Sequence, residues 1–176
     1  MIIAIDVDDV CAKLTETWLE KYNSHYKDNL KESDITAWNT SQFVKPECGQ
    51  LIYSYLKDKS LYDNVRPVEG ALDGVNELRK WGHRVIFATA TPMESAGRKF
   101  SWLEDNGFAP KEADYVELYD KSLICADILF DDKYDNAMKF RGMGILLTKP
   151  WNVDLPFAYR VPDWDTFLRI VKIKGS

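Results

Sequence analysis

Short runs of consecutive apolar residues recur along the chain, each flanked by polar or turn-forming residues. Four are clear, at residues 2–5, 85–88, 128–130 and 145–147. They are rich in Ile, Val and Leu and lack polar alternation, which is typical of strands buried on both faces of a parallel sheet. Residues 115–118 form a weaker fifth run, and residues 158–161 are a candidate edge strand. The pattern therefore predicts a sheet that is mainly parallel.

Stretches with helical spacing separate several of these runs. Leu72, Val75 and Leu78 precede Gly82, and the apolar positions within residues 100–103 precede Gly107. A glycine or asparagine just past the last periodic residue is the usual left-handed cap of a helix. Alternating strands and helices predict an α/β fold, a Rossmann-like domain of three layers around a parallel sheet.

Residues 15–65 interrupt this alternation, because they contain no strand-like run and are rich in helix-forming and aromatic residues. We therefore expect two units: an α/β core of residues 1–14 plus 66–176, and a small helical cap of residues 15–65 inserted after the first strand. The aromatic rings of the cap can pack a core of its own. One or two of them can instead stack on a flat ligand, and the sequence leaves both interpretations open.

Composition narrows the classes of function. The chain has 176 residues and a formal charge of −5, and it can bury roughly 70% of its unfolded surface as one domain. The net negative charge disfavours binding to a nucleic-acid polymer. The apolar run at the start is too short for a membrane span or a signal peptide. Three cysteines without metal-like spacing are typical of a reducing compartment, so we expect a cytoplasmic location and no membrane association.

Carboxylates follow two of the predicted strands. Asp6, Asp8 and Asp9 come directly after the first strand, and Asp131 and Asp132 come at the end of a later one. A solvated acidic turn is the alternative explanation for such a cluster, but at the end of a buried strand like charges need a cation or hydrogen-bond donors. Two such strand ends side by side would form an oxygen-rich site suited to Mg²⁺.

Potential phosphate ligands accompany these acids. Thr89 ends another apolar run with a hydroxyl, and Lys99 and Lys121 are candidate partners for a dianion, although a single lysine is usually just a solvated charge. Ligands of open α/β sheets bind where the strand order reverses. If the first strand lies between the strand ending at Thr89 and the one ending at Asp131, all these groups meet. Acids, a cation, a hydroxyl and an ammonium at one point indicate phosphoryl transfer.

These motifs resemble those of a known group of enzymes. The Asp-x-Asp after the first strand, the later Thr, the Lys and the Asp-Asp pair resemble the haloacid dehalogenase superfamily (HAD) of phosphohydrolases. Within it, four segments look like the 5'(3')-deoxyribonucleotidase family: residues 6–10, 67–71, 121–132 and 150–152. The segment 121–132 is specific over its whole length, whereas Asp-x-Asp alone is a weak signal.

The resemblance implies catalytic and metal-binding roles. Asp6 would be the nucleophile that takes the phosphoryl group as an aspartyl phosphate. Asp8 would be the acid that protonates the departing sugar oxygen and then the base that activates water. Mg²⁺ would be held by Asp6, the backbone carbonyl of Asp8 and Asp132, with Asp131 nearby or acting through water.

The resemblance also implies substrate-binding roles. Thr89 and Lys121 would hold the phosphate oxygens and, with the metal, offset the repulsion between carboxylate and phosphate. The family's first aromatic residue of the cap falls near Leu14 here. Stacking on the base would therefore depend on another ring, and we expect Trp38 or Phe43 to provide it.

The segment after Thr89 also departs from the family. It reads Ala90-Thr91-Pro92 instead of Ser-Pro. Either the hydroxyl of Thr91 or a backbone N–H would then fill the position of the family's serine, and the sequence leaves this open.

The predicted function is that of a 5'-nucleotidase: Mg²⁺-dependent hydrolysis of nucleoside monophosphates, with deoxyribonucleotides favoured. Two alternatives stay open, a HAD phosphatase for another small phosphate ester and a catalytically silent nucleotide-binding relative, although the presence of both Asp6 and Asp8 argues against the second. A signalling receiver domain fits poorly, because its lysine follows all its acids whereas Lys121 precedes Asp131. The expected partner is a small phosphate ester. The preferred base and sugar, the 5' or 3' position and the formation of a homodimer are left open.

Overall fold

The computed structural model describes residues 1–175, which form a six-stranded sheet in which every neighbouring pair is parallel. The strands are β1 (Ile2–Ile5), β2 (Arg84–Thr89), β3 (Tyr115–Glu117), β4 (Ile128–Asp131), β5 (Met143–Leu147) and β6 (Arg160–Val161). Their order is β3-β2-β1-β4-β5-β6. The prediction of a parallel α/β sheet is confirmed, and β1 does lie between β2 and β4.

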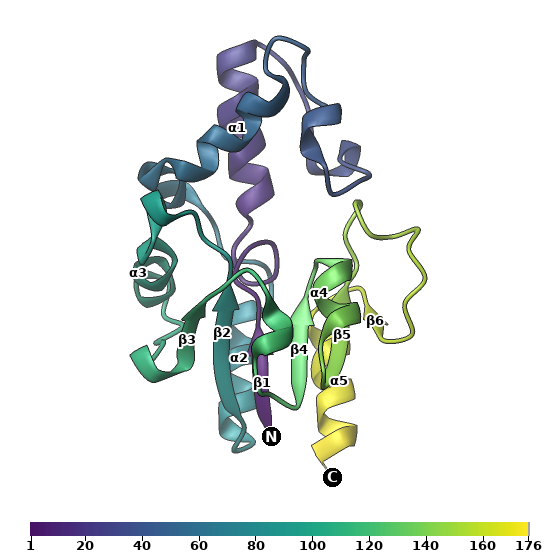
Figure 1. Cartoon of the computed structure of the whole chain (residues 1–176). Helices are drawn as coiled ribbons and strands as arrows, with labels where there is room; N and C mark the ends of the chain where they lie inside the picture. Colours follow the sequence, from purple (N-terminus) through teal and green to yellow (C-terminus); the bar gives the residue numbers. More distant parts are fainter. Residues whose placement is uncertain (176) are drawn as a thin grey trace.

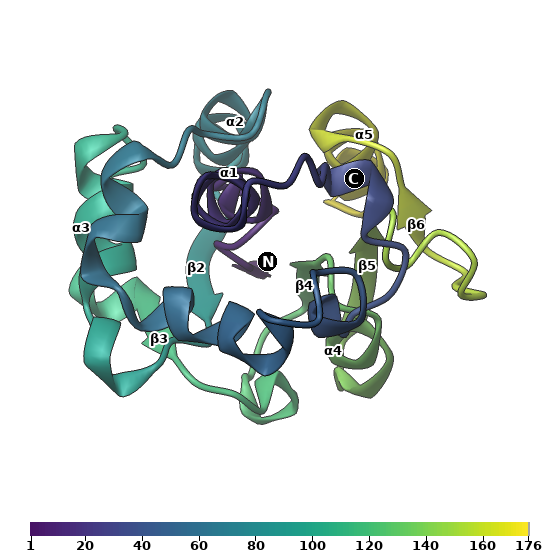
Figure 2. The ribbon, with the colours of Figure 1, turned by 90° about the horizontal axis from the view of Figure 1, so that it is seen from above.

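Helices cover both faces of the sheet, as expected for strands without polar alternation. Within residues 1–175 there are five α-helices: α1 (Leu14–Tyr26), α2 (Ala71–Lys80), α3 (Arg98–Asp105), α4 (Tyr134–Lys139) and α5 (Trp164–Gly175). Helices α2 and α5 lie together on one face and α4 lies on the other (Figure 2). This is the three-layer arrangement that the alternating pattern predicts.

The two faces of β1 contribute to different hydrophobic clusters, because successive side chains of a strand point to opposite sides. Ile3 and Ile5 belong to the larger cluster, under α2 and α5, whereas Ala4 packs on the side of α4. The larger cluster requires close contact between α2 and α5. A Cβ atom at Gly74 of α2 would lie 2.3 Å from the indole ring of Trp164, so only glycine fits there.

The inserted segment, residues 15–65, stands above the carboxyl edge of the sheet (Figure 1). It holds most of α1 and four 3₁₀ helices, Glu32–Asp34, Thr40–Gln42, Gly49–Lys57 and Lys59–Asn64. It has its own small hydrophobic cluster around Trp18, Tyr22 and Ile52. The chain leaves and re-enters the α/β part at adjacent points, because the Lys13 N–H donates to the Arg66 carbonyl at 2.8 Å. Its behaviour as a separate cap domain stays a prediction.

Side chains bridge the inserted segment to loops at the carboxyl edge of the sheet. On one side the Ser95 hydroxyl donates to the Leu56 carbonyl at 3.1 Å. On the other side the Lys149 ammonium lies 2.9 Å from the Glu32 carboxylate. These contacts hold the inserted segment over the strand ends. Among residues 1–175, no helix has both the length and the apolar character needed to cross a membrane.

Candidate active site

Three buried carboxylates meet where β1 and β4 end. Asp6 follows β1, Asp131 is the last residue of β4, and Asp132 follows it. One carboxylate oxygen of each lies within 4.8 Å of the others. Three of the predicted metal ligands are thus brought together because the carboxyl ends of neighbouring parallel strands share one edge.

Lys121 lies between two of these acids. Its ammonium is 2.8 Å from Asp6 Oδ1 and 2.6 Å from Asp131 Oδ2, and the residue is only 2% exposed. Asp131 also accepts hydrogen bonds from the Lys133 N–H at 2.7 Å and from Asn136 Nδ2 at 3.1 Å. With its oxygens occupied by these donors, Asp131 acts here as the anchor of Lys121.

Asp6 is held through one of its two carboxylate oxygens. Its Oδ1 accepts from the Val7 N–H at 2.7 Å and pairs with Lys121. Among residues 1–175, no hydrogen bond to Oδ2 of Asp6 is found. A carboxylate that is fixed through one oxygen and free at the other is suited to act as a nucleophile or a metal ligand.

Asp132 is fixed by the loop after β5. The indole Nε1 of Trp151 donates to Asp132 Oδ2 at 2.9 Å, and the amide of Asn152 donates to the Asp132 carbonyl at 2.7 Å. The sequence showed Trp151 and Asn152 only as part of a family-like segment. Their contacts explain that segment physically, because they orient the second carboxylate of the pair.

The electrostatics of this cluster favour a cation. Burial raises the pKa of Asp6 to about 7, although Lys121 acts in the opposite direction. Burial and then the charges of Asp131 and Asp6 raise the pKa of Asp132 well above its usual range. The pKa of Lys121 is also raised, because its attraction to Asp131 and Asp6 outweighs the effect of burial. One ammonium among three acids leaves negative charge uncompensated, and an oxygen-ligated divalent ion would offset it.

Asp8 points to a second group of residues. Its Oδ2 lies 2.6 Å from the Lys99 ammonium, and its Oδ1 accepts a hydrogen bond from the Tyr62 hydroxyl. Lys99 Nζ also donates to Thr89 Oγ1 at 2.9 Å and to the Ala90 carbonyl at 2.6 Å. The structure therefore joins Asp8 to Thr89 through Lys99. Sequence reasoning named Lys99 only in passing and did not find Tyr62, which is 54 residues from Asp8 in the chain.

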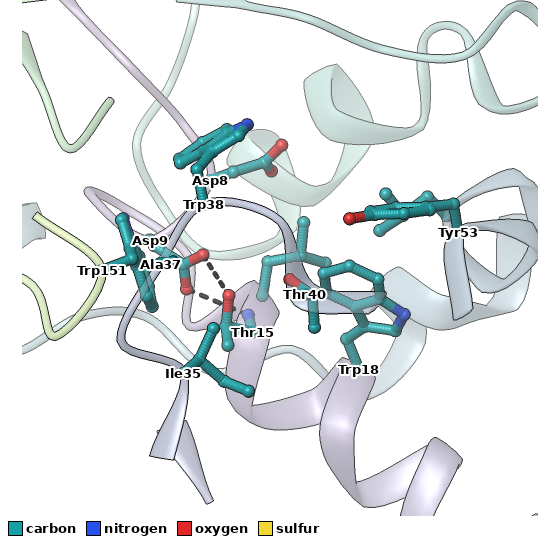
Figure 3. Close-up of a pocket in the computed structure, with 12 residues that line it drawn as sticks. Asp8, Asp9, Thr15, Trp18, Ile35, Ala37, Trp38, Thr40, Tyr53 and Trp151 are labelled. Atoms are coloured by element: carbon teal, nitrogen blue, oxygen red, sulfur yellow. Dashed lines mark hydrogen bonds between the residues drawn. The ribbon is translucent and has the colours of Figure 1, made fainter. Parts of the chain in front are cut away.

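Asp9 has a structural position in the same loop. Its carboxylate accepts from the Thr15 N–H at 2.9 Å and from the Thr15 hydroxyl at 2.6 Å, as Figure 3 shows. The acceptor lies at the first turn of α1, where a negative charge is favourable. Asp9 therefore fixes the start of the inserted segment.

A cavity of about 210 Å³ opens beside Asp8, between the sheet edge and the inserted segment (Figure 3). Its walls are mainly apolar and aromatic, and they include Leu14, Trp18, Ile35, Trp38, Tyr53, Leu56 and Trp151. The polar atoms of two of these rings are engaged elsewhere: Trp18 Nε1 donates to the Ile52 carbonyl at 2.9 Å and the Tyr53 hydroxyl to Asn39 at 2.8 Å. The rings therefore present mostly apolar surface to a ligand.

The two rings predicted to stack on a base lie in different places. Trp38 lines the cavity and is 54% exposed, with the ammonium of Lys133 4.8 Å from its ring centre. Phe43 packs against Leu19, Ile35 and Trp151 and is not among the described residues that line the cavity. Sequence reasoning did not single out Trp18, Tyr53 or Trp151 as wall residues, because an aromatic side chain alone does not indicate which way it faces.

The family model and the similar proteins that match this chain describe the same family. A family model described as "5' nucleotidase, deoxy (Pyrimidine), cytosolic type C protein" matches residues 1–175. The 5'(3')-deoxyribonucleotidase of Clostridium acetobutylicum is 31% identical over 165 residues, covering 92% of this chain and 89% of that protein. The 5'(3')-deoxyribonucleotidase of Bacillus subtilis is 31% identical over 169 residues, covering 96% of each.

Solved structures share the fold at lower identity. A HAD family hydrolase from Deinococcus radiodurans, with bound phosphate and sodium, has a TM-score of 0.63 and 12% identity, covering 99% of this chain and 95% of that one. The putative HAD hydrolase YfnB of Bacillus subtilis, bound to magnesium, has a TM-score of 0.62 and 12% identity, covering 97% of each chain.

Proposed function

On the premise that this chain belongs to the family of deoxy (pyrimidine), cytosolic type C 5'-nucleotidases, we propose that it releases phosphate from deoxyribonucleoside monophosphates with the help of Mg²⁺. The family makes the chain a phosphoric monoester hydrolase that acts on nucleotides. The finer proposal, including an aspartyl-phosphate intermediate, rests on the geometry of the strand ends. A cytoplasmic location stays a prediction.

The observation that carries the proposal is the arrangement of Asp6. The carboxylate is buried, anchored through Oδ1 to Lys121 and the Val7 N–H, and beside two further acids. A carboxylate attacks a phosphate dianion only when positive charge offsets their repulsion. Lys121 supplies one positive charge, and the acid cluster fits a metal ion that would supply more.

The residues present fit Mg²⁺, a hard cation that prefers oxygen ligands. Asp6, Asp132 and the backbone carbonyl of Asp8 would hold it, with Asp131 adjacent and occupied by Lys121. When bound, the ion supplies positive charge that offsets the charge of the phosphate and of the nucleophile.

The proposed reaction has two steps. In the first, Asp6 attacks phosphorus, the bond from phosphorus to the sugar oxygen breaks, and Asp8 gives its proton to the departing oxygen. In the second, a water molecule attacks phosphorus, Asp8 takes a proton from it, and the bond to Asp6 breaks with release of phosphate. Thr89 and Lys121 bind the phosphate oxygens throughout, and Lys99, which contacts Thr89, adds a second ammonium.

A panel of nucleoside monophosphates tests the function directly. Purified protein is incubated with deoxyribo- and ribonucleotides carrying 5' or 3' phosphate, with and without Mg²⁺, and released phosphate is measured. We expect the deoxyribonucleotides to be the best substrates. Faster turnover of sugar phosphates or other small esters would favour a HAD phosphatase of another specificity. Nucleotide binding without turnover would indicate a silent relative.

Removal of metal should stop the reaction reversibly. We expect excess EDTA to reduce phosphate release to background and added Mg²⁺ to restore it, because Lys121 alone does not offset the charge of Asp6, Asp132 and a phosphate dianion. The measurement is the initial rate before EDTA, after EDTA and after Mg²⁺ is returned. Full activity in the absence of any divalent ion would contradict the proposed charge compensation.

Trp38 is the ring proposed to stack on the base. We expect Trp38→Ala to raise KM for nucleotides by roughly ten- to a hundredfold, since stacking of a base on an aromatic ring contributes about 1–3 kcal/mol, and to change kcat little. KM for p-nitrophenyl phosphate should change less. Trp81→Ala, at the end of α2 and beside His83, is the matched control. An unchanged nucleotide KM in Trp38→Ala would remove this ring from the proposed binding site.

A further inference from the structure

Two donors hold the carboxylate of Asp8, and they come from distant parts of the chain. The Tyr62 hydroxyl, from the inserted segment, donates to Oδ1. The Lys99 ammonium, from α3, lies 2.6 Å from Oδ2. The Asp8 side chain is otherwise partly open to solvent, with 25% exposure, and it lines the cavity of about 210 Å³. Its orientation therefore depends on these two contacts.

Tyr62 is itself rigidly packed. It is 6% exposed, and its ring meets Trp102 edge to face, with 6.1 Å between ring centres. Trp102 is fixed in turn by a hydrogen bond from its Nε1 to the Val65 carbonyl at 2.9 Å. Both rings belong to the main hydrophobic cluster of the α/β sheet. Although Tyr62 belongs to the inserted segment, its hydroxyl is thus fixed relative to the strand ends.

The two donors differ in how many partners they serve. Lys99 is shared among Asp8, Thr89 and the Ala90 carbonyl, and a phosphate held by Thr89 would compete for the same ammonium. The Tyr62 hydroxyl donates its hydrogen bond to Asp8. A bound phosphate would therefore compete for Lys99 but leave the hydrogen bond between Tyr62 and Asp8 in place.

Proton transfer to a leaving group depends strictly on geometry. The donor must lie within hydrogen-bond reach of the departing oxygen, and a displacement of about 1 Å can cost on the order of a hundredfold in rate. A carboxyl at the end of a rotatable side chain meets this requirement when a fixed neighbour holds one of its oxygens.

We propose that Tyr62 is a positioning residue for Asp8: its hydroxyl holds the carboxyl group in the orientation from which Asp8 protonates the departing sugar oxygen. This inference rests on the proposed function, because it takes the acid role of Asp8 from there. Tyr62 does not touch the phosphorus or the leaving group and acts only through Asp8.

The test compares two leaving groups in Tyr62→Phe, which removes the hydroxyl and keeps the ring on Trp102. Rapid-quench measurement gives the first-turnover release of nucleoside from the best nucleotide of the panel and of nitrophenolate from p-nitrophenyl phosphate. We expect nucleoside release to slow roughly tenfold, the equivalent of one hydrogen bond to a charged group, with KM nearly unchanged. Nitrophenolate release should be nearly unaffected, because this leaving group departs without a proton.

A matched control is available in the same segment. Tyr22 is fully buried, and its hydroxyl donates to Asp28 at 2.5 Å and accepts from the Lys45 N–H at 2.8 Å. Tyr22→Phe removes a comparable contact between a phenol and a carboxylate that lies outside the candidate active site. We expect it to lower the melting temperature and to leave both release rates unchanged.

A double-mutant cycle with Asp8→Asn distinguishes a failure of the role proposed for Tyr62 from a failure of the acid role proposed for Asp8. We expect Asp8→Asn to slow nucleoside release strongly and Tyr62→Phe to add no further loss in that background. Unchanged nucleoside release in Tyr62→Phe, an equal loss for both substrates, or an additive loss in the double variant would overturn the role of Tyr62. Unchanged nucleoside release in Asp8→Asn itself would instead overturn the acid role in the proposed function.

Discussion

Asp6→Asn should abolish phosphate release, with a loss on the order of 10⁴-fold or more in kcat, as for other essential nucleophiles. The amide cannot form the acyl phosphate. The fold should persist, because the side chain has the same shape and its oxygen can still accept from the Val7 N–H and Lys121. Lys121 also keeps Asp131 as its anion at 2.6 Å. The measurement is the phosphate-release rate, with a thermal melt as the check of folding.

The matched control for Asp6 lies at the amino ends of the strands, on the side of the sheet away from the candidate active site. Asp127 accepts the Ile2 N–H at 2.6 Å at the amino end of β1, so Asp127→Asn removes a carboxylate charge outside the candidate active site. We expect it to retain activity. If Asp6→Asn kept more than a few per cent of wild-type turnover, Asp6 would lose the role of nucleophile.

Lys121→Met should have the largest effect on stability. The substitution leaves Asp6 and Asp131 buried without their common cation, and breaking a buried ion pair in this way costs about 3–5 kcal/mol. We therefore expect the free energy of unfolding at pH 7, in EDTA, to fall by about that amount. Turnover should fall as well, because phosphate loses a proposed partner. Lys139→Met, at an exposed lysine of α4, is the control.

The stability loss in Lys121→Met should depend on pH with a defined sign. Without the ammonium, the folded-state pKa of Asp6 should rise above the value of about 7 it has beside Lys121, while the ordinary value is 3.8. A carboxyl with a raised folded-state pKa stabilises the fold below its unfolded pKa and loses that contribution as pH rises through the folded pKa. The loss of unfolding free energy in Lys121→Met, relative to the wild type, should therefore be smallest below pH 4 and grow toward neutral pH. Equal unfolding free energies at pH 7 would contradict the buried ion cluster.

The sheet and the meeting of its strand ends could be predicted from the sequence. Strands buried on both faces leave a compositional signal, and each of the six runs contains a strand in the structure, although only residues 160–161 of the run 158–161 are in one. Once β1 lies between β2 and β4, the register of parallel strands brings Asp6, Thr89 and Asp131 to the same edge. The topology therefore explains why separate motifs could be combined into one candidate site.

The partners that orient these residues could not be predicted in the same way. Tyr62, Trp38 and Phe43 lie in a segment of 3₁₀ helices and turns, which imposes no regular alternation between inward and outward positions. The direction of each ring depends on contacts with distant parts of the chain, such as Tyr62 with Trp102 and Phe43 with Trp151. Lys99 was a candidate partner for a dianion in the sequence, but its contact with Asp8, 91 residues away, is set by the tertiary fold.

The adjacent ends of the inserted segment affect how the protein can change in evolution. Because the Lys13 N–H and the Arg66 carbonyl are hydrogen-bonded neighbours, the stretch between them can lengthen, shorten or be exchanged without displacing β1 or α2. The residues of the inserted segment that select the ligand can thus vary, while the residues at the strand ends that cleave the phosphate ester stay the same. Tyr62 limits this freedom, since any replacement would have to restore a donor for Asp8.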